Sequence, residues 1–143
     1  MSQVRRGVLT AIATVALAGA AQLAMGQASN EWPTYGGDTG NTRYSGLSQI
    51  NTKNVNKLRV AWMQSLGSLE SQESTPLVLD GVMYLPNPHG VIQALDGATG
   101  DLIWEYRPAS TTARAGNGVQ RNIAIYGDKI FGTTDDAHIV ALD

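Results

Sequence analysis

Short apolar runs separated by turn residues fill most of the chain beyond its N-terminal apolar stretch. Gly, Asp, Asn and Thr interrupt runs rich in Val, Ile, Leu and Tyr, and no long segment has the 3.6-residue period of a helix. This pattern predicts an all-β structure. The expected strands are Val60–Leu66, Thr75–Leu79, Val82–Leu85, Val91–Leu95, Leu102–Tyr106, Asn122–Tyr126, Lys129–Gly132 and His138–Leu142.

The chain also contains an internal repeat. Residues 77–96 align without gaps with residues 124–143, an offset of 47 residues, and both segments end in Ala-Leu-Asp. Asp80-Gly81 and Gly127-Asp128 lie at matching places between apolar runs, where tight hairpin turns are expected. A period of about 40–50 residues with about four strands is typical of a propeller blade. A β-sandwich has strands of similar length but no reason to repeat its sequence, so we predict a propeller.

The number of repeats accounts for only part of a propeller. A propeller closes its ring with about four to eight blades. The chain supplies one complete blade, three strands of a second blade and a lead-in strand that ends near Leu66. We therefore expect residues 27–143 to form the incomplete β-propeller of a longer protein, with unpaired strand edges that favour aggregation when the chain is expressed alone.

The first 26 residues have the layout of a secretory signal peptide. Arg5 and Arg6 precede an apolar stretch, and small residues allow cleavage after Gly26 or Ala28. An uncleaved membrane anchor is the alternative, because the stretch is just long enough to span a bilayer, but its many Ala and Gly residues make it only weakly apolar. We favour a cleaved signal over residues 1–26, and hence a periplasmic or secreted protein with no stable membrane span.

Charge and cysteine content narrow the possible partners. Without Arg5 and Arg6 the chain keeps eight basic residues against twelve acidic ones, a net charge of −4. This charge argues against binding to nucleic acid or to anionic lipid. The chain has no cysteine, which excludes disulfides, thiolate zinc sites, covalent haem attachment and a lipoprotein anchor within it.

Three motifs resemble those of PQQ-dependent quinoprotein alcohol dehydrogenases, whose cofactor is pyrroloquinoline quinone. Residues 94–104, ALDGATGDLIW, are similar to the tryptophan-docking motif of that family. Residues 32–45, WPTYGGDTGNTRYS, are similar to the start of the mature enzymes, and residues 72–84, QESTPLVLDGVMY, are closer to the methanol and ethanol branch than to the glucose branch. The resemblance implies an eight-bladed propeller, of which this chain is an N-terminal fragment.

The residue types of the docking motif indicate a structural role. Asp96, Thr99 and Gly100 are suited to the turn between the third and outer strands of a blade, and Trp104 can then lie against a neighbouring blade. We interpret Trp62 in the same way, as a packing residue and not as the aromatic ring that stacks on the cofactor. His89 and His138 lack ligand spacing and are interpreted as ordinary polar residues.

The resemblance also implies two cofactor contacts, Glu73 and Arg121. Each precedes the innermost strand of its blade by a few residues, so both are expected to face the channel in which propellers bind ligands. A guanidinium offers planar donors to the carboxylates of PQQ, and a carboxylate can accept a hydrogen bond from its ring. The catalytic Asp and the ligands of a calcium or lanthanide ion are expected beyond residue 143, and the resemblance also allows haem c in a later domain.

One departure from the family concerns the loop before Arg121. Many relatives carry two adjacent cysteines over the cofactor, and the matching positions here are Ala115 and Gly116. The leading hypothesis is a periplasmic enzyme that uses PQQ to oxidise a primary alcohol to an aldehyde, with cytochrome c or a similar protein as electron acceptor. The alternatives are a quinoprotein acting on a sugar or polymeric alcohol and a non-catalytic PQQ-like propeller scaffold. The fragment alone is not expected to be active.

Overall fold

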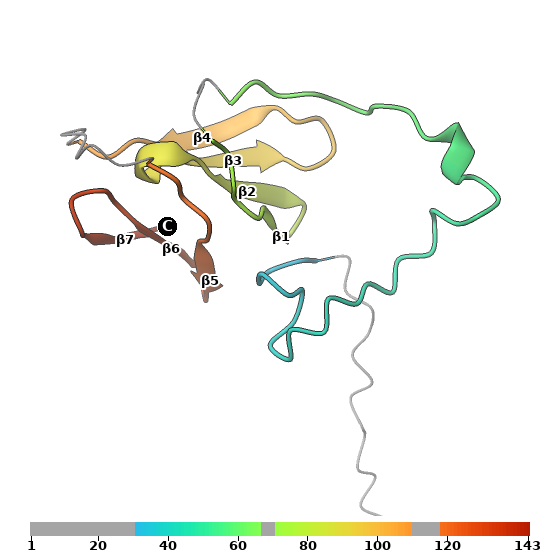
Figure 1. Cartoon of the computed structure of the whole chain (residues 1–143), viewed down its shortest axis with the longest axis horizontal. Coiled ribbons are helices and arrows are strands. Elements are labelled where there is room, and N and C mark those ends of the chain that lie inside the picture. The colour runs from blue at the N-terminus through green and yellow to red at the C-terminus, as the bar shows by residue number, and fades with distance from the viewer. Residues whose placement is uncertain (1–30, 67–70, 110–117) are drawn as a thin grey trace, which may run out of the picture.

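The computed structural model describes residues 31–66, 71–109 and 118–143, which form two antiparallel sheets (Figure 1). The proposed signal, residues 1–26, lies outside the described residues. The first sheet has the order β1-β2-β3-β4 and the second the order β5-β6-β7. Their strands are β1 Leu77–Leu79, β2 Val82–Pro86, β3 Ile92–Asp96, β4 Leu102–Tyr106, β5 Ala124–Tyr126, β6 Lys129–Thr133 and β7 Ile139–Leu142. These seven strands match seven of the eight predicted ones to within two residues at each end.

The register of the two sheets reproduces the 47-residue repeat. In the first sheet Leu77 is opposite Tyr84 and Tyr84 is opposite Ala94. In the second sheet the matching row is formed by Ala124, Phe131 and Ala141, each displaced by 47 residues. The two sheets are therefore successive copies of one unit, as expected of propeller blades.

The prediction of a strand over Val60–Leu66 was wrong. No strand is assigned to these residues, although their apolar and polar positions alternate in part. A strand requires a neighbour that accepts its backbone hydrogen bonds, and no described strand pairs with this segment. Val60 and Met63 are accordingly exposed, at 75% and 87%.

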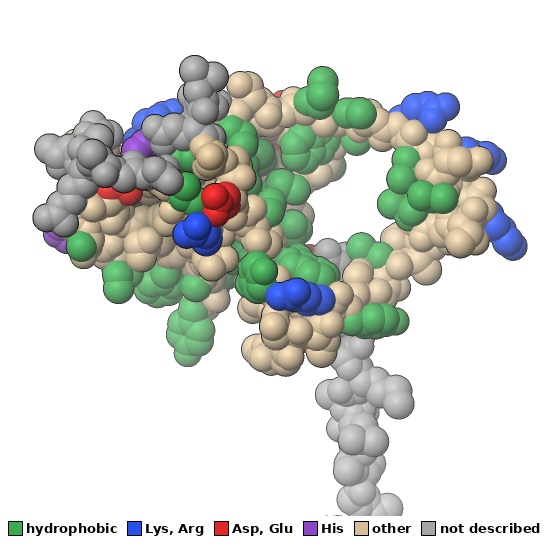
Figure 2. Space-filling model, in the orientation of Figure 1, with side chains coloured by type: hydrophobic (Ala, Val, Ile, Leu, Met, Phe, Trp, Pro, Cys, Tyr) green, Lys and Arg blue, Asp and Glu red, His purple; other side chains and the backbone are tan. Residues whose placement is uncertain are grey.

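Residues 31–66 form an arm that extends away from the two sheets, drawn from blue to green in Figure 1. The arm contains one short helix, η1 Val55–Lys57, and is attached to the first sheet by a bridge between Trp32 and Val78. Figure 2 shows apolar side chains along the arm. Those more than half exposed include Tyr35, Tyr44, Ile50, Leu58, Val60 and Met63. The arm thus presents several large apolar side chains to solvent.

Expressed without residues 1–30, the chain is expected to self-associate. The apolar arm and the strand edges of both sheets provide the surfaces for association. Size-exclusion chromatography with light scattering, together with binding of a hydrophobic dye, measures this directly. A monomer that melts cooperatively would contradict the interpretation of these surfaces as parts of larger interfaces.

The core lies between the two sheets. Leu77 and Ile92 of the first sheet pack with Ile130 of the second sheet and with Ile123, which directly precedes β5, and Ile92 is completely buried. Trp104 is half-buried and packs against this cluster, with its ring centroid 6.2 Å from that of Tyr84. Trp104 also lines a pocket together with Ile130 and Leu142 of the second sheet, so it lies beside the neighbouring blade, as predicted.

Trp62 packs on the turn that follows β3. Its Nε1 donates to the Gly97 carbonyl at 3.2 Å, and a Cβ added at Gly100 would lie 2.5 Å from its ring. Gly100 has a φ of 78°, so both its backbone and its surroundings require glycine. The packing role predicted for Trp62 is confirmed, although the segment that carries it is not a strand.

Asp96 forms the same turn, as predicted from the docking motif. Its Oδ1 accepts from the backbone N–H groups of Ala98 and Thr99, both at 2.8 Å. These hydrogen bonds, that of Thr99 first, hold the pKa of Asp96 below its ordinary value of 3.8. Because the folded-state pKa is lowered, the stabilisation is complete above pH 3.8 and is lost as the pH falls through the lowered pKa.

Replacing Asp96 by Asn is therefore expected to make stability less sensitive to acid. Asn keeps an acceptor oxygen for the turn but has no charge to lose. We expect Asp96→Asn to melt below the wild type at neutral pH, and the gap between the two melting temperatures to narrow below pH 3.8. Melting curves from pH 7 to pH 2.5 test this, and a gap that is constant across the range would show that the Asp96 charge does not contribute.

Candidate functional site

Glu73 and Arg121 form an ion pair between the two blades. Arg121 Nη2 lies 2.9 Å from Glu73 Oε2. Both side chains are largely accessible, at 65% for Arg121 and 48% for Glu73. The structure therefore brings together the two residues predicted to bind the cofactor, and leaves most of the guanidinium open to a further partner.

The backbone holds the two residues in the same place. Glu73 precedes β1 and Arg121 precedes β5, so each lies at the entrance to the first strand of its sheet. The Thr75 N–H donates to the Arg121 carbonyl at 3.2 Å and joins the two entrances directly. Both residues lie at the strand entrances, as predicted, and their orientation toward the channel stays a prediction.

The segment that leads to Arg121 is tethered on both sides. The His89 N–H donates to the Gly118 carbonyl at 2.8 Å, and a Cβ added at Gly118 would lie 2.4 Å from the His89 ring. Gln120 donates through Nε2 to the Thr133 carbonyl and to Thr133 Oγ1, the latter at 3.1 Å. Arg121 thus follows a backbone that both blades hold in position.

The segment that leads to Glu73 is held by a chain of side chains that sequence reasoning missed. Gln72 Nε2 donates to Ser74 Oγ at 2.6 Å, to the Pro86 carbonyl at 2.8 Å and to Asn87 Oδ1 at 3.2 Å. Asn87 and Gln93 are buried, and Asn87 Nδ2 donates to Gln93 Oε1 at 2.9 Å. Gln93 Nε2 then donates to Glu105 Oε2 at 2.8 Å.

The far end of this chain is an ionised carboxylate. The hydrogen bond from Gln93, and then Arg107, hold the pKa of Glu105 below its ordinary value of 4.5. Arg107 Nε donates to Glu105 Oε1 at 2.5 Å. Polar residues in a strand pattern usually indicate its solvent face. The spacing of Gln93 in its strand therefore gave no signal of its burial.

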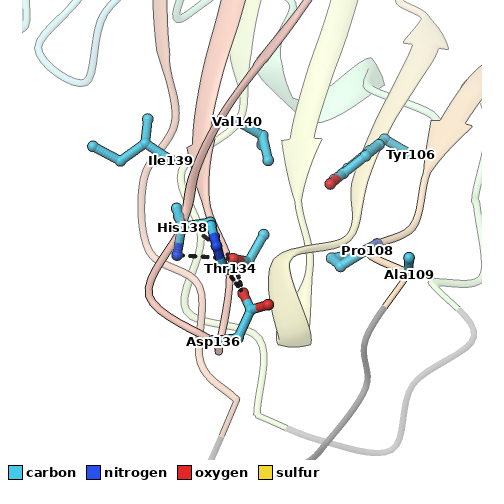
Figure 3. A pocket seen from close by; sticks show the side chains of 8 residues that line it. All are labelled: Tyr106, Pro108, Ala109, Thr134, Asp136, His138, Ile139 and Val140. Atoms are coloured by element: carbon cyan, nitrogen blue, oxygen red, sulfur yellow. Dashed lines mark hydrogen bonds and ion pairs between the residues drawn. The ribbon is translucent and has the colours of Figure 1, made fainter.

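A pocket elsewhere in the structure has a different character. Figure 3 shows it between the end of β4 and the loop that joins β6 to β7. Its lining residues do not include Glu73 or Arg121. His138 Nδ1 lies 3.0 Å from Asp136 Oδ1, and Thr134 donates to the same carboxylate, so its polar groups are engaged with each other. His89 is likewise engaged, with its Nδ1 2.6 Å from Asp135 Oδ2.

Other predicted features lie outside this site. Ala115 and Gly116, which replace the adjacent cysteines of many relatives, lie outside the described residues. Within the described ranges no group of three or more His, Cys, Asp or Glu residues is arranged to hold a metal ion. The helices found in those ranges are too short and too polar to cross a membrane.

Comparison with known families agrees with this geometry. The family described as the PQQ glucose, ethanol and alcohol dehydrogenase β-propeller domain matches residues 32–143. The chain belongs to this family. The match to this PQQ dehydrogenase family covers both blades, the arm and the two site residues.

Curated relatives are much longer than this chain. The dehydrogenase subunit of the alcohol dehydrogenase (quinone) of Gluconacetobacter polyoxogenes is 38% identical over 94% of this chain and 20% of its own length. A 1-butanol dehydrogenase (cytochrome c) of Thauera butanivorans is 38% identical over 81% of this chain and 17% of its own length. The chain spans 16–20% of the length of the curated relatives it matches.

Solved structures of the PQQ dehydrogenase family have the same fold over most of the chain. The quinohemoprotein alcohol dehydrogenase of Comamonas testosteroni matches with a TM-score of 0.75 and 39% identity, over 82% of this chain and 18% of that one. A europium-containing methanol dehydrogenase matches with a TM-score of 0.71 and 38% identity, over 79% of this chain and 21% of that one. The two sheets are therefore blades of a PQQ dehydrogenase propeller.

Proposed function

We propose that this chain is part of a periplasmic PQQ-dependent enzyme that oxidises a primary alcohol to an aldehyde, and that Glu73 and Arg121 bind the cofactor. The observation that carries the proposal is the Glu73–Arg121 pair, joined at 2.9 Å at the entrances to the first strands of two adjacent blades. Relatives named as alcohol dehydrogenases support the reaction class. The apolar stretch after Arg5 and Arg6 supports export.

The residues present fit PQQ chemically. An arginine has five N–H donors, of which the ion pair to Glu73 uses only part. The rest of the accessible guanidinium can bind a carboxylate or carbonyl of the cofactor with planar, charge-assisted hydrogen bonds. Glu73 neutralises Arg121 and keeps it oriented, and its oxygens can accept a hydrogen bond from a ring N–H.

When bound, PQQ supplies the acceptor for the two electrons that leave the alcohol carbon. In this proposal the described residues bind and orient the cofactor, and the general base and metal ligands come from other parts of the complete protein. A calcium or lanthanide ion is proposed, since one relative is a europium-containing methanol dehydrogenase. A cytochrome c type acceptor is proposed because one relative carries that partner in its name.

The test uses the complete protein that contains this chain. The apo-protein is purified from the periplasmic fraction and titrated with PQQ in the presence of calcium or a lanthanide. Binding is followed by quenching of tryptophan fluorescence, and turnover by reduction of an artificial electron acceptor with ethanol, glucose or a polymeric alcohol as substrate. We expect saturable PQQ binding and faster turnover with ethanol.

Each other outcome has a definite meaning. A protein that does not bind PQQ in any of these conditions would be a propeller scaffold, and the proposal would be wrong. Preference for glucose or the polymeric alcohol would retain the cofactor assignment and replace the substrate class. Recovery of the protein from the cytoplasm with an intact N-terminus would overturn the proposed location.

A further inference from the structure

The loop between β2 and β3 contacts both segments of the Glu73–Arg121 site. This loop, Asn87–Val91, includes the short helix η2 Pro88–Gly90. Asn87 accepts from Gln72, which directly precedes Glu73, and the His89 N–H donates to Gly118, three residues before Arg121. One loop therefore reaches the two site segments, which are far apart in the sequence.

We propose that the loop Asn87–Val91 positions the Glu73–Arg121 pair for PQQ, with Asn87 as the positioning residue that fixes Glu73 through Gln72. The proposal rests on the cofactor role of Glu73 and Arg121 proposed above. Asn87 does not touch either site residue in the described contacts, so it acts through Gln72. Its burial, with 3% of its surface exposed, makes its hydrogen bonds costly to leave unmade.

The amide orientations of Gln93 and Asn87 follow from Glu105. A carboxylate only accepts, so Gln93 must turn its NH₂ group toward Glu105 and its oxygen toward Asn87. Asn87 must then donate to Gln93, which leaves Asn87 Oδ1 as the acceptor for Gln72. Asn87 Oδ1 and the Pro86 carbonyl, which only accepts, thus hold the NH₂ group of Gln72 from the same side, directly beside Glu73.

The loop Asn87–Val91 is held in place by an internal hydrogen bond and by close neighbours. The Asn87 N–H donates to the Val91 carbonyl at 2.7 Å. A Cβ added at Gly90 would lie 2.9 Å from the Thr133 carbonyl oxygen and 3.3 Å from the Pro108 ring, so the loop is enclosed by its neighbours. Gln93 and Glu105 are directly opposite each other on β3 and β4, which fixes the hydrogen bond between them by strand register.

The test measures PQQ affinity and apo-protein stability separately in the complete protein. Gln72→Met removes the donors to Asn87, Pro86 and Ser74 with little change in volume or charge, at an exposed position. Gln64→Met makes the same change at another exposed glutamine, in the arm. Mutating a residue that orients a metal ligand typically weakens metal binding by about 10–100-fold. We expect a comparable effect here, an increase of about tenfold in the Kd of Gln72→Met for PQQ. The melting temperature of Gln72→Met should fall slightly, because buried Asn87 Oδ1 loses this donor, but the apo-protein should stay folded. Gln64→Met should change neither quantity.

A double-mutant cycle then tests whether Gln72 and Asn87 act together. Asn87→Leu is also expected to raise the Kd by about tenfold. The double variant should raise it by about tenfold as well, because the first substitution already breaks the connection. Additive effects, of about a hundredfold in the double variant, would overturn the proposal. If Asn87→Leu does not fold, the Kd of Gln72→Met for PQQ is the test. An unchanged Kd in that variant overturns the proposal.

Arg121→Ala, measured in parallel, separates this inference from the proposed function. A weaker PQQ complex in Arg121→Ala with wild-type affinity in Gln72→Met would reject the positioning role and leave the cofactor assignment in place. Wild-type affinity in both variants would reject the positioning role of Asn87 and also the cofactor assignment of Arg121. Lower affinity in both variants, with Gln72→Met still folded at the temperature of the titration, is the expected result.

Discussion

Arg121→Ala is expected to weaken PQQ binding by roughly 10- to 150-fold while leaving the propeller folded. A hydrogen bond to a charged group contributes about 1.5–3 kcal/mol, and each 1.4 kcal/mol is tenfold in Kd. Arg121 is 65% exposed and makes its ion pair at the rim of the two blades, so its side chain contributes little to packing. Titration of the apo-protein with PQQ, alongside its melting curve, separates lost affinity from lost stability.

Two arginine variants make this measurement specific. Arg121→Lys keeps the charge but not the planar set of donors, so its affinity should lie between those of the wild type and Arg121→Ala. Arg59→Ala removes an exposed arginine whose guanidinium bonds only to the carbonyls of Lys57 and Leu58, and should bind PQQ like the wild type. If Arg121→Ala and Arg59→Ala had the same affinity, the cofactor assignment of Arg121 would be wrong.

The repeat in the sequence was sufficient to predict both blades. Two segments with the same spacing of apolar residues and the same hairpin turns can fold independently into the same local structure, because each strand pairs with its neighbour along the chain. The turn at Asp80 and Gly81 illustrates this. Both residues have positive φ, at 51° and 76°, as the Asp-Gly pair predicts.

The prediction failed where structure depends on distant partners. Val60–Leu66 has the composition of a strand, but a strand exists only where a second strand is available, and local pattern does not report on that. The segment is instead anchored through Trp62 to the Gly97 carbonyl, 35 residues away. A similar contact fixes the arm, where the Trp32 ring lies against Gly37.

The site was predictable only in part for the same reason. Glu73 and Arg121 could be located because the resemblance indicated them and the repeat placed each of them just before the first strand of its blade. The hydrogen-bonded side chains next to Glu73 could not be predicted. They are Gln72, Asn87, Gln93 and Glu105, and they meet only once β2, β3 and β4 have paired in register. Buried amides give no periodic signal, because nothing in their spacing distinguishes them from exposed ones.

Ile92→Ala is expected to cause the largest loss of stability among single substitutions in the described core. Ile92 is fully buried and packs with Leu77, Ile123 and Ile130, so it contacts both blades. Truncating such a side chain typically costs about 2–5 kcal/mol, and Ile92→Val about 0.5–1.5 kcal/mol. The melting temperature of the complete protein should therefore fall in the order wild type, Ile92→Val, Ile92→Ala.

Gly132 provides a test of whether this loss reflects contact between the blades. A Cβ added at Gly132 would lie 2.7 Å from Ile92 Cδ1, whereas its other neighbours are at 3.8 Å. Gly132→Ala should therefore lower the melting temperature in the wild type, because a buried Cδ1 cannot move without disturbing the core. Ile92→Val lacks that carbon, so the same substitution should cost much less in its background. Equal losses in the two backgrounds would show that β6 and β3 do not meet at this point, and the packing of the two blades described above would be wrong.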